Sequence, residues 1–176
     1  MLVREIYKGK SIIFEAYCRT SKSRGVEMKV ALKVYKKKHI MSCPVLKHHV
    51  ESEISNHIAL NHENIIMLYA AFEDDKNVYL VEDYADGDLY SIYRKGVRLQ
   101  ERSVALYVIL PLLKSLDHLH SSKRIIHRDV KPENCVIMAS TSQLKLADFG
   151  LSIHQAEERP VTRCGTLGRS SALALS

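Results

Sequence analysis

The spacing of apolar residues changes along the chain from the pattern of strands to the pattern of helices. Residues 12–14 and 30–35 are rich in β-branched and apolar side chains and predict two strands on either side of a polar loop at 19–25. Two more strands are expected at 65–72 and 78–84, joined by a turn of polar residues. The first part of the chain therefore reads as mainly β.

Apolar residues also recur at helical spacing, first between the strands at 30–35 and 65–72 and again after the strand at 78–84. One set of apolar residues recurs every four positions, as on one face of a helix. Its members are Leu46, Val50, Ile54 and Ile58. A second such set predicts a helix over about 101–120. Its members are Val104, Val108, Leu112 and Leu116. Short strands are expected on either side of 140–142. The order of elements indicates an α+β fold of two lobes, the first β-rich with one main helix.

Composition fits one globular domain: the chain has 176 residues, of which 46% are hydrophobic and 26% charged. The net charge of +6 suits a phosphate-bearing ligand, a nucleic acid or a solvated basic face such as 36–38. Since aromatic and basic residues form no common stripe, we expect no nucleic-acid partner.

The four cysteines form no Cys-x-x-Cys pair, which predicts reduced thiols and a cytoplasmic or nuclear location. The N-terminus has no apolar segment typical of a signal peptide. The longest apolar run, 104–113, contains Pro111 and is too short to span a membrane, so we expect no membrane partner.

Candidate chemistry is concentrated in the second half of the chain. Asp129, Lys131 and Asn134 offer a carboxylate, an ammonium and a carboxamide within one short loop. The carboxylate can accept a proton from a hydroxyl, the ammonium can neutralise a phosphoryl group, and the amide oxygen is a hard ligand for magnesium. Asp148 follows a predicted strand and offers a second hard ligand, with Gly150 permitting a sharp turn after it.

These segments resemble the catalytic and metal-binding loops of protein kinases. Residues 127–134 read His-Arg-Asp-Val-Lys-Pro-Glu-Asn, and 148–150 read Asp-Phe-Gly. The resemblance implies that Asp129 is the catalytic base, that Asn134 and Asp148 hold Mg²⁺, and that ATP is bound. It also implies that Lys131 contacts the γ-phosphate, and a lysine there indicates a serine/threonine kinase acting on protein hydroxyls.

Other segments extend the resemblance into the first lobe. Val-Ala-Leu-Lys at 30–33 is similar to the kinase motif whose lysine binds the α- and β-phosphates, which assigns that role to Lys33. The lysine of this motif is held by a glutamate of the following helix. Glu53 is the best match and Glu51 the alternative.

The segment 80–85 resembles the strand and hinge that bind adenine, so the backbone of Asp83, Tyr84 and Ala85 is expected to contact the base. Glu82 then stands at the gatekeeper position, where a buried carboxylate needs a partner or a proton. Four apolar residues would sandwich the adenine ring. They are Ile13, Ala31, Leu89 and Val136.

The activation segment would begin at Asp148 and end near Thr166. Thr162 stands where the family carries its activating phosphothreonine, and Arg128 is expected to pair with that phosphate. The string Thr-x-Cys-Gly-Thr-Leu at 162–167, together with 80–85 and 125–134, most resembles Aurora-type and related kinases.

Two regions depart from the family pattern. The family's glycine-rich loop would place its three glycines at Ile6, Lys8 and Ser11, whereas Gly9 stands one position out of register. Side chains there would hinder close approach of backbone amides to phosphates. After Leu167, nothing matches the family's substrate-docking segment and later helices.

We therefore expect a C-terminally truncated kinase domain at 1–167 and a divergent, disordered tail at 168–176. Its first lobe would cover about 1–84, its hinge 83–88 and its partial second lobe 89–167. Apolar residues of the 104–116 helix would face water and suit a partner chain. The predicted function is a serine/threonine kinase; the alternative is a non-catalytic, pseudokinase-like binding module, or a fragment that binds ATP without turnover.

Overall fold

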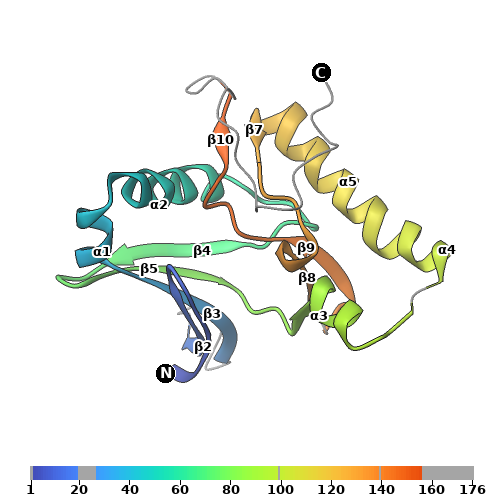
Figure 1. Ribbon diagram of the computed structural model, residues 1–176, viewed down its shortest axis with the longest axis horizontal. Helices are drawn as coiled ribbons and strands as arrows, with labels where there is room; N and C mark the ends of the chain where they lie inside the picture. Colours follow the sequence, from blue (N-terminus) through green and yellow to red (C-terminus); the bar gives the residue numbers. More distant parts are fainter. Residues whose placement is uncertain (1, 20–26, 99, 139, 156–176) are drawn as a thin grey trace.

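The structure is a computed structural model that describes residues 2–19, 27–98, 100–138 and 140–155 (Figure 1). Its first part is a five-stranded antiparallel sheet with the strand order β1-β2-β3-β5-β4. The strands are β1 (Leu2–Lys8), β2 (Ile12–Arg19), β3 (Glu27–Lys36), β4 (Leu68–Glu73) and β5 (Asn77–Asp83). The expected α+β fold with a β-rich first lobe is confirmed.

Strand register decides which residues share a face of this sheet. Lys33 on the central strand β3 lies opposite Ile13 on one neighbouring strand and Leu80 on the other. Ala31 lies opposite Glu82 in the same way. Directly opposed residues of antiparallel strands project to the same side, so these five residues share one face.

Helix α2 (Pro44–His57) covers that face, preceded by the short helix α1 (Lys37–Ser42) (Figure 1). Pro44 occupies the first turn of α2, where a missing backbone N–H costs nothing. Three of the four residues of the apolar stripe predicted for this helix pack on the sheet, whereas Ile58 follows the end of the helix and is 58% exposed. The buried cluster contains Tyr35, Ile40, Val50, Leu68 and Leu80, with Leu46, Ile54 and Val78 packed against it. Burial of this stripe fixes α2 beside Lys33.

The second part is built on one long helical segment, as the sequence predicts for about 101–120. It comprises α4 (Glu101–Val104), a π-helical turn η1 (Ala105–Ile109), α5 (Leu110–Asp117) and a second π turn η2 (His118–Ser122). Pro111 cannot donate a backbone hydrogen bond to the preceding turn, and the first π turn lies just before it. Helix α3 (Leu89–Arg94) lies near its N-terminal end (Figure 1).

Short strands flank the two segments, 127–134 and 148–150, that contain the candidate catalytic and metal-binding residues. A three-stranded sheet has the order β6-β8-β9, and β7 pairs with β10. The bounds are β6 (Gly87–Asp88), β7 (Ile125–Ile126), β8 (Cys135–Met138), β9 (Gln143–Leu146) and β10 (Ile153–His154), with a 3-10 turn η3 at Pro132–Asn134. Residues 127–134 therefore lie between β7 and β8, and residues 148–150 follow β9.

Two details differ from the predicted elements. Residues 2–8 form a strand that the apolar pattern did not indicate. The strand expected at 65–72 begins only at Leu68, because Ile65 instead forms an isolated parallel bridge with Leu146. The backbone N–H of Ile66 also donates to the carbonyl of Leu146, at 3.0 Å. This segment therefore joins the first part of the molecule to the second.

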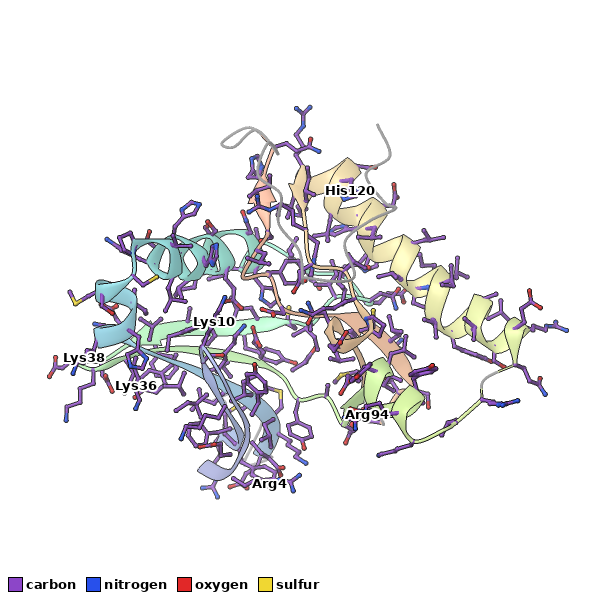
Figure 2. All side chains as sticks on the ribbon, in the orientation of Figure 1. Arg4, Lys10, Lys36, Lys38, Arg94 and His120 are labelled. Carbon is purple, nitrogen blue, oxygen red and sulfur yellow. The ribbon has the colours of Figure 1, made fainter. Side chains whose placement is uncertain are left out.

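Within the described ranges, no helix is both long and apolar enough to cross a membrane. Cys18, Cys43 and Cys135 are free thiols, whereas Cys164 lies outside the described residues. Basic side chains occur over several elements: Arg4 lies on β1, Lys36 and Lys38 near α1, and Arg94 on α3 (Figure 2).

The long helical segment allows a matched test of the fold. Leu119 is fully buried in a cluster with Leu60, Ile65 and Phe149, whereas Leu113 is 56% exposed. Replacing Leu119 by alanine should lower the free energy of unfolding by about 2–5 kcal/mol, because it leaves a cavity. Leu113→Ala should change it by no more than about 0.5 kcal/mol. Urea unfolding measures both, and equal losses would contradict this packing.

Candidate active site

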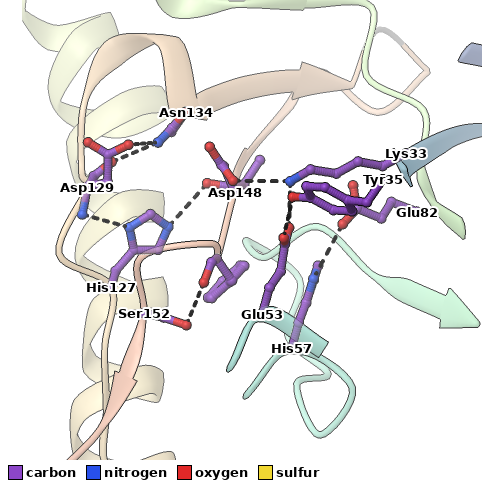
Figure 3. A network of polar contacts seen from close by, with 12 residues as sticks. Lys33, Tyr35, Glu53, His57, Glu82, His127, Asp129, Asn134, Asp148 and Ser152 are labelled. Atoms are coloured by element: carbon purple, nitrogen blue, oxygen red, sulfur yellow. Dashed lines mark hydrogen bonds and ion pairs between the residues drawn. The ribbon is translucent and has the colours of Figure 1, made fainter. Parts of the chain in front are cut away.

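The centre of the candidate site is a buried ion pair between β3 and α2. The Nζ atom of Lys33 lies 2.5 Å from Oε1 of Glu53, and the Glu53 side chain is fully buried (Figure 3). Of the two glutamates considered from the sequence, only Glu53 makes this contact. Glu51 is exposed, and its Oε1 atom lies 3.8 Å from Nζ of Lys47 on the same helix.

Asp148 brings a second carboxylate to the same lysine. Its Oδ1 atom lies 3.2 Å from Nζ of Lys33. The residue adopts a left-handed backbone conformation with φ of 66°, which directs its side chain toward the sheet (Figure 3). The charge of Lys33 lowers the pKa of Asp148 to about 2. Burial is the largest single effect on Lys33 and disfavours its charge, but Glu53, Tyr35, Asp148 and Glu82 together outweigh it and raise the pKa of Lys33 well above its usual value.

The loop after β7 assembles the three polar residues that the sequence placed together. Nζ of Lys131 lies 2.7 Å from Oδ2 of Asp129. The Asn134 amide nitrogen donates to the backbone carbonyl of Asp129 at 2.8 Å and to its Oδ2 at 3.1 Å. The amide nitrogen of Asn134 is thus directed at Asp129, and its oxygen is the atom suited to a cation. That oxygen and the carboxylate of Asp148 are the hard donors that Mg²⁺ prefers.

A buried aromatic stack connects the two sides of the site. The Phe149 ring stacks on His57 of α2 at 4.6 Å between centroids and meets His127 edge-on at 4.9 Å. Nδ1 of His127 accepts from the backbone N–H of Asp129 at 3.3 Å, so its Nε2 is the donor to the carbonyl of Ala147 at 3.1 Å. Burial lowers the pKa of His127 to about 4, which keeps this ring neutral near pH 7.

Glu82, the carboxylate predicted to stand at the gatekeeper position, lies beside His57 of α2. Its Oε1 atom lies 3.5 Å from Nδ1 of His57, whose Nε2 lies 2.6 Å from the carbonyl oxygen of Ile66. A carbonyl only accepts, so Nε2 of His57 carries a proton. The sequence showed the need for a partner but not its identity.

The residues expected around adenine lie on the sheet and at the start of the second part. Ile13 and Ala31 share the face of Lys33, while Val136 on β8 lies opposite Asp88, next to Leu89. All four are partly exposed. Leu89 also packs against the buried residues Val108, Cys135 and Leu144.

The hinge side chains are engaged with the protein itself. Lys145 and Tyr69 donate to the carboxylate of Asp83 at 2.6 and 2.5 Å. The Tyr84 hydroxyl donates to Glu15 at 3.2 Å, and Nζ of Lys29 lies 3.8 Å from the centre of its ring. The side chains of Asp83 and Tyr84 thus have partners within the protein, and contact of the 83–85 backbone with adenine stays a prediction.

The glycine-poor segment forms the turn between β1 and β2. The backbone N–H of Gly9 donates to the carbonyl of Ser11 at 2.9 Å, and Ser11 is buried. A Cβ atom at Gly9 would meet only the outer end of the exposed Tyr7 side chain, so a larger residue at this turn would require Tyr7 to move. Thr162, Thr166 and Cys164 lie outside the described residues.

Two residues that sequence reasoning did not select belong to the network. The Tyr35 hydroxyl donates to Oε2 of Glu53 at 2.7 Å, and His57 joins Glu82 to Phe149. A signal existed for both: Tyr35 follows Lys33 by two positions on one strand, and His57 follows Glu53 by one helical turn.

Comparison with known proteins agrees with this geometry. Residues 15–169 match the protein kinase domain, and the chain therefore belongs to that family. It is 37% identical over 160 residues to an Aurora kinase of Schizosaccharomyces pombe, covering 90% of this chain and 43% of the relative. It is 43% identical over 139 residues to serine/threonine-protein kinase Aurora-1 of Arabidopsis thaliana, covering 78% and 46%.

Aurora kinase A-A of Xenopus laevis is 39% identical over 148 residues, which cover 84% of this chain and 35% of the relative. The predicted resemblance to Aurora-type kinases is thus confirmed. The chain spans less than half the length of these relatives.

Burial of His127 predicts acid sensitivity. The pKa of His127 is about 4 in the folded chain and near 6.5 in the unfolded chain, so the unfolded chain binds the extra proton between these values. Stability should fall by about 3 kcal/mol as the pH drops from about 6.5 to 4. Asp148 contributes only at lower pH, since its pKa is lowered from 3.8 to about 2.

Urea unfolding at a series of pH values measures this slope. His127→Phe keeps a ring beside Phe149 but cannot titrate, so its stability should be lower at neutral pH and less dependent on pH over this window. An equal slope in the variant and the parent would contradict the assignment.

Proposed function

We propose that this chain is part of a serine/threonine protein kinase that transfers the γ-phosphoryl group of ATP to protein hydroxyls. The observation that carries the proposal is the Lys33–Glu53 pair, with Asp148 on the same lysine and Asp129, Lys131 and Asn134 gathered in the neighbouring loop (Figure 3). Phosphoryl transfer needs little covalent chemistry from the protein and depends mainly on positioned charges of this kind.

The residues divide the work of the reaction. Asp129 accepts the proton of the attacking hydroxyl, and Lys131, held 2.7 Å from it, neutralises the transferring group. Lys33 binds the α- and β-phosphates while Glu53 fixes its position. Asn134 and Asp148 would hold Mg²⁺, which when bound would neutralise phosphate charge. A lysine at position 131 favours serine and threonine as acceptors.

Adenine would lie between the sheet and β8. Ile13 and Ala31 cover one side of the base, and Val136 and Leu89 the other. The backbone of residues 83–85 supplies hydrogen bonds, since the Asp83 carboxylate is engaged by Lys145 and Tyr69. Apolar residues on both faces of the base would accept the adenine of any nucleotide. Contacts between Lys33 and the α- and β-phosphates would favour nucleotides that carry both.

Regulation by phosphorylation of Thr162 is part of the proposal. Arg128 adopts a left-handed backbone conformation with φ of 64°, and its Nε donates to the carbonyl of Leu151 at 2.6 Å. This bond orients the guanidinium beside the segment that leads to Thr162, where it can pair with a phosphate. We place the protein in the cytoplasm or nucleus, in keeping with its free thiols.

One observation favours a second candidate, a binding module without turnover. Five apolar residues of η1 and α5 are 46–65% exposed, as the sequence led us to expect for this helix. They are Leu106, Tyr107, Ile109, Leu110 and Leu113. A contiguous apolar surface of this kind suits a protein partner. The candidates differ in their need for Mg-ATP.

Mg-ATP should stabilise the chain, and removal of either the phosphate-binding lysine or the magnesium-binding aspartate should abolish the effect. At about 100 times its dissociation constant, a ligand adds about 2.7 kcal/mol, which for a domain of this size raises Tm by roughly 8 °C. Lys33→Met and Asp148→Asn should each remove this shift, as measured by thermal unfolding with and without Mg-ATP.

Lys114→Met is the matched control, because Lys114 is an exposed lysine that pairs with Glu63 at the surface. It should retain the full shift. Transfer of phosphate to a generic basic protein then tests turnover, with Asp129→Asn as the inactive variant. A parent chain that Mg-ATP does not stabilise would contradict the kinase proposal and leave the binding module.

A further inference from the structure

We propose that Tyr35 is a positioning residue of the phosphate-binding site, whose hydroxyl holds Glu53 in the orientation that pairs with Lys33. Its effect on nucleotide binding rests on the proposed function, whereas its effect on α2 does not. The two parts of the Tyr35 side chain have different roles. The hydroxyl binds Glu53, and the ring packs in the apolar core.

The two oxygens of Glu53 have separate donors. Lys33 donates to Oε1 at 2.5 Å, and the Tyr35 hydroxyl donates to Oε2 at 2.7 Å (Figure 3). Residues two apart on a strand project to the same side, so Lys33 and Tyr35 reach the carboxylate from adjacent places on β3. A carboxylate held at both oxygens has one orientation, whereas one held at a single oxygen can rotate.

Burial makes the second donor necessary. Glu53 has no exposed surface, so water cannot replace the Tyr35 hydroxyl as a donor to Oε2. An unsatisfied buried acceptor that belongs to a charged group is costly. Lys33 cannot supply all the stabilisation, because its ammonium also contacts Asp148 at 3.2 Å and must reach the phosphates. Tyr35 therefore holds Glu53 independently of the nucleotide.

The ring of Tyr35 brings the hydroxyl to this place. Tyr35 is 6% exposed and packs with Ile40, Val50 and Leu80 between the sheet and α2. Burial raises the pKa of Tyr35 far above its usual value, so its hydroxyl remains a donor at any working pH. Replacement by phenylalanine keeps the ring and removes only the donor.

Tyr79 provides a matched control on the same sheet. Its hydroxyl also donates to a carboxylate, Oδ2 of Asp74, at 2.7 Å. Tyr79 lies opposite Val34 on β3, and Val34 and Lys33 project to opposite faces, so this tyrosine faces away from α2. Tyr79→Phe therefore removes a more exposed tyrosine–carboxylate bond, together with the bond that its oxygen accepts from Asn77 at 3.0 Å, without touching Glu53.

The first measurement needs no nucleotide. Amide hydrogen exchange of α2 should become about tenfold faster in Tyr35→Phe, the loss expected for one hydrogen bond to a charged group. Exchange in β5 should change less, and Tyr79→Phe should leave α2 unchanged. An increase in α2 no larger than that in β5 would overturn the proposal, because the hydroxyl would then affect only overall stability.

The second measurement compares Mg-ATP with adenosine by calorimetric titration. Because Tyr35 acts on phosphates through Glu53 and Lys33, Tyr35→Phe should weaken Mg-ATP about tenfold and leave adenosine binding unchanged. Equal weakening of both ligands, or unchanged Mg-ATP affinity, would overturn it. A parent chain that does not bind Mg-ATP would refute the proposed function alone, and α2 exchange would then decide the role of Tyr35.

Discussion

The arrangement of this molecule depends on one buried ion pair, Lys33 with Glu53. Neither group tolerates burial alone: the lysine is nearly covered and the glutamate wholly covered. Each therefore fixes the other, and with it the placement of α2 against the central strand of the sheet. Asp148 completes the group from the second part of the chain, so the same lysine also connects the two parts.

A second connection runs through aromatic rings. Phe149 lies between His57 on α2 and His127 beside the Asp129 loop, so the helix and that loop both pack on the same ring. The left-handed backbone at Arg128 and Asp148 persists because neighbouring contacts determine it from several sides. A shift of α2 would disturb the ion pair and this stack together.

Sequence patterns predicted the family and several of the helices and strands. The 127–134 and 148–150 motifs identified the family because their spacing between short strands is fixed, and the α2 stripe was clear from its period. Other features depend on register. In the sequence, Tyr35 and His57 look like ordinary interior residues. Only the packing of α2 on the sheet shows that Tyr35 contacts Glu53 and that His57 contacts Glu82. Residues 2–8 carried no strand pattern and acquire their structure by pairing with β2.

A double-mutant cycle on Lys33 and Glu53 tests the central claim most directly. The free energies of unfolding of Lys33→Met, Glu53→Gln and the double variant are compared with that of the parent chain. If the pair is buried and interdependent, each single variant deprives the remaining group of its closest charged partner, and the double variant is less destabilised than the sum by at least about 1 kcal/mol. Losses that add within about 0.5 kcal/mol would show that the two groups do not interact in the folded chain, and would contradict the account.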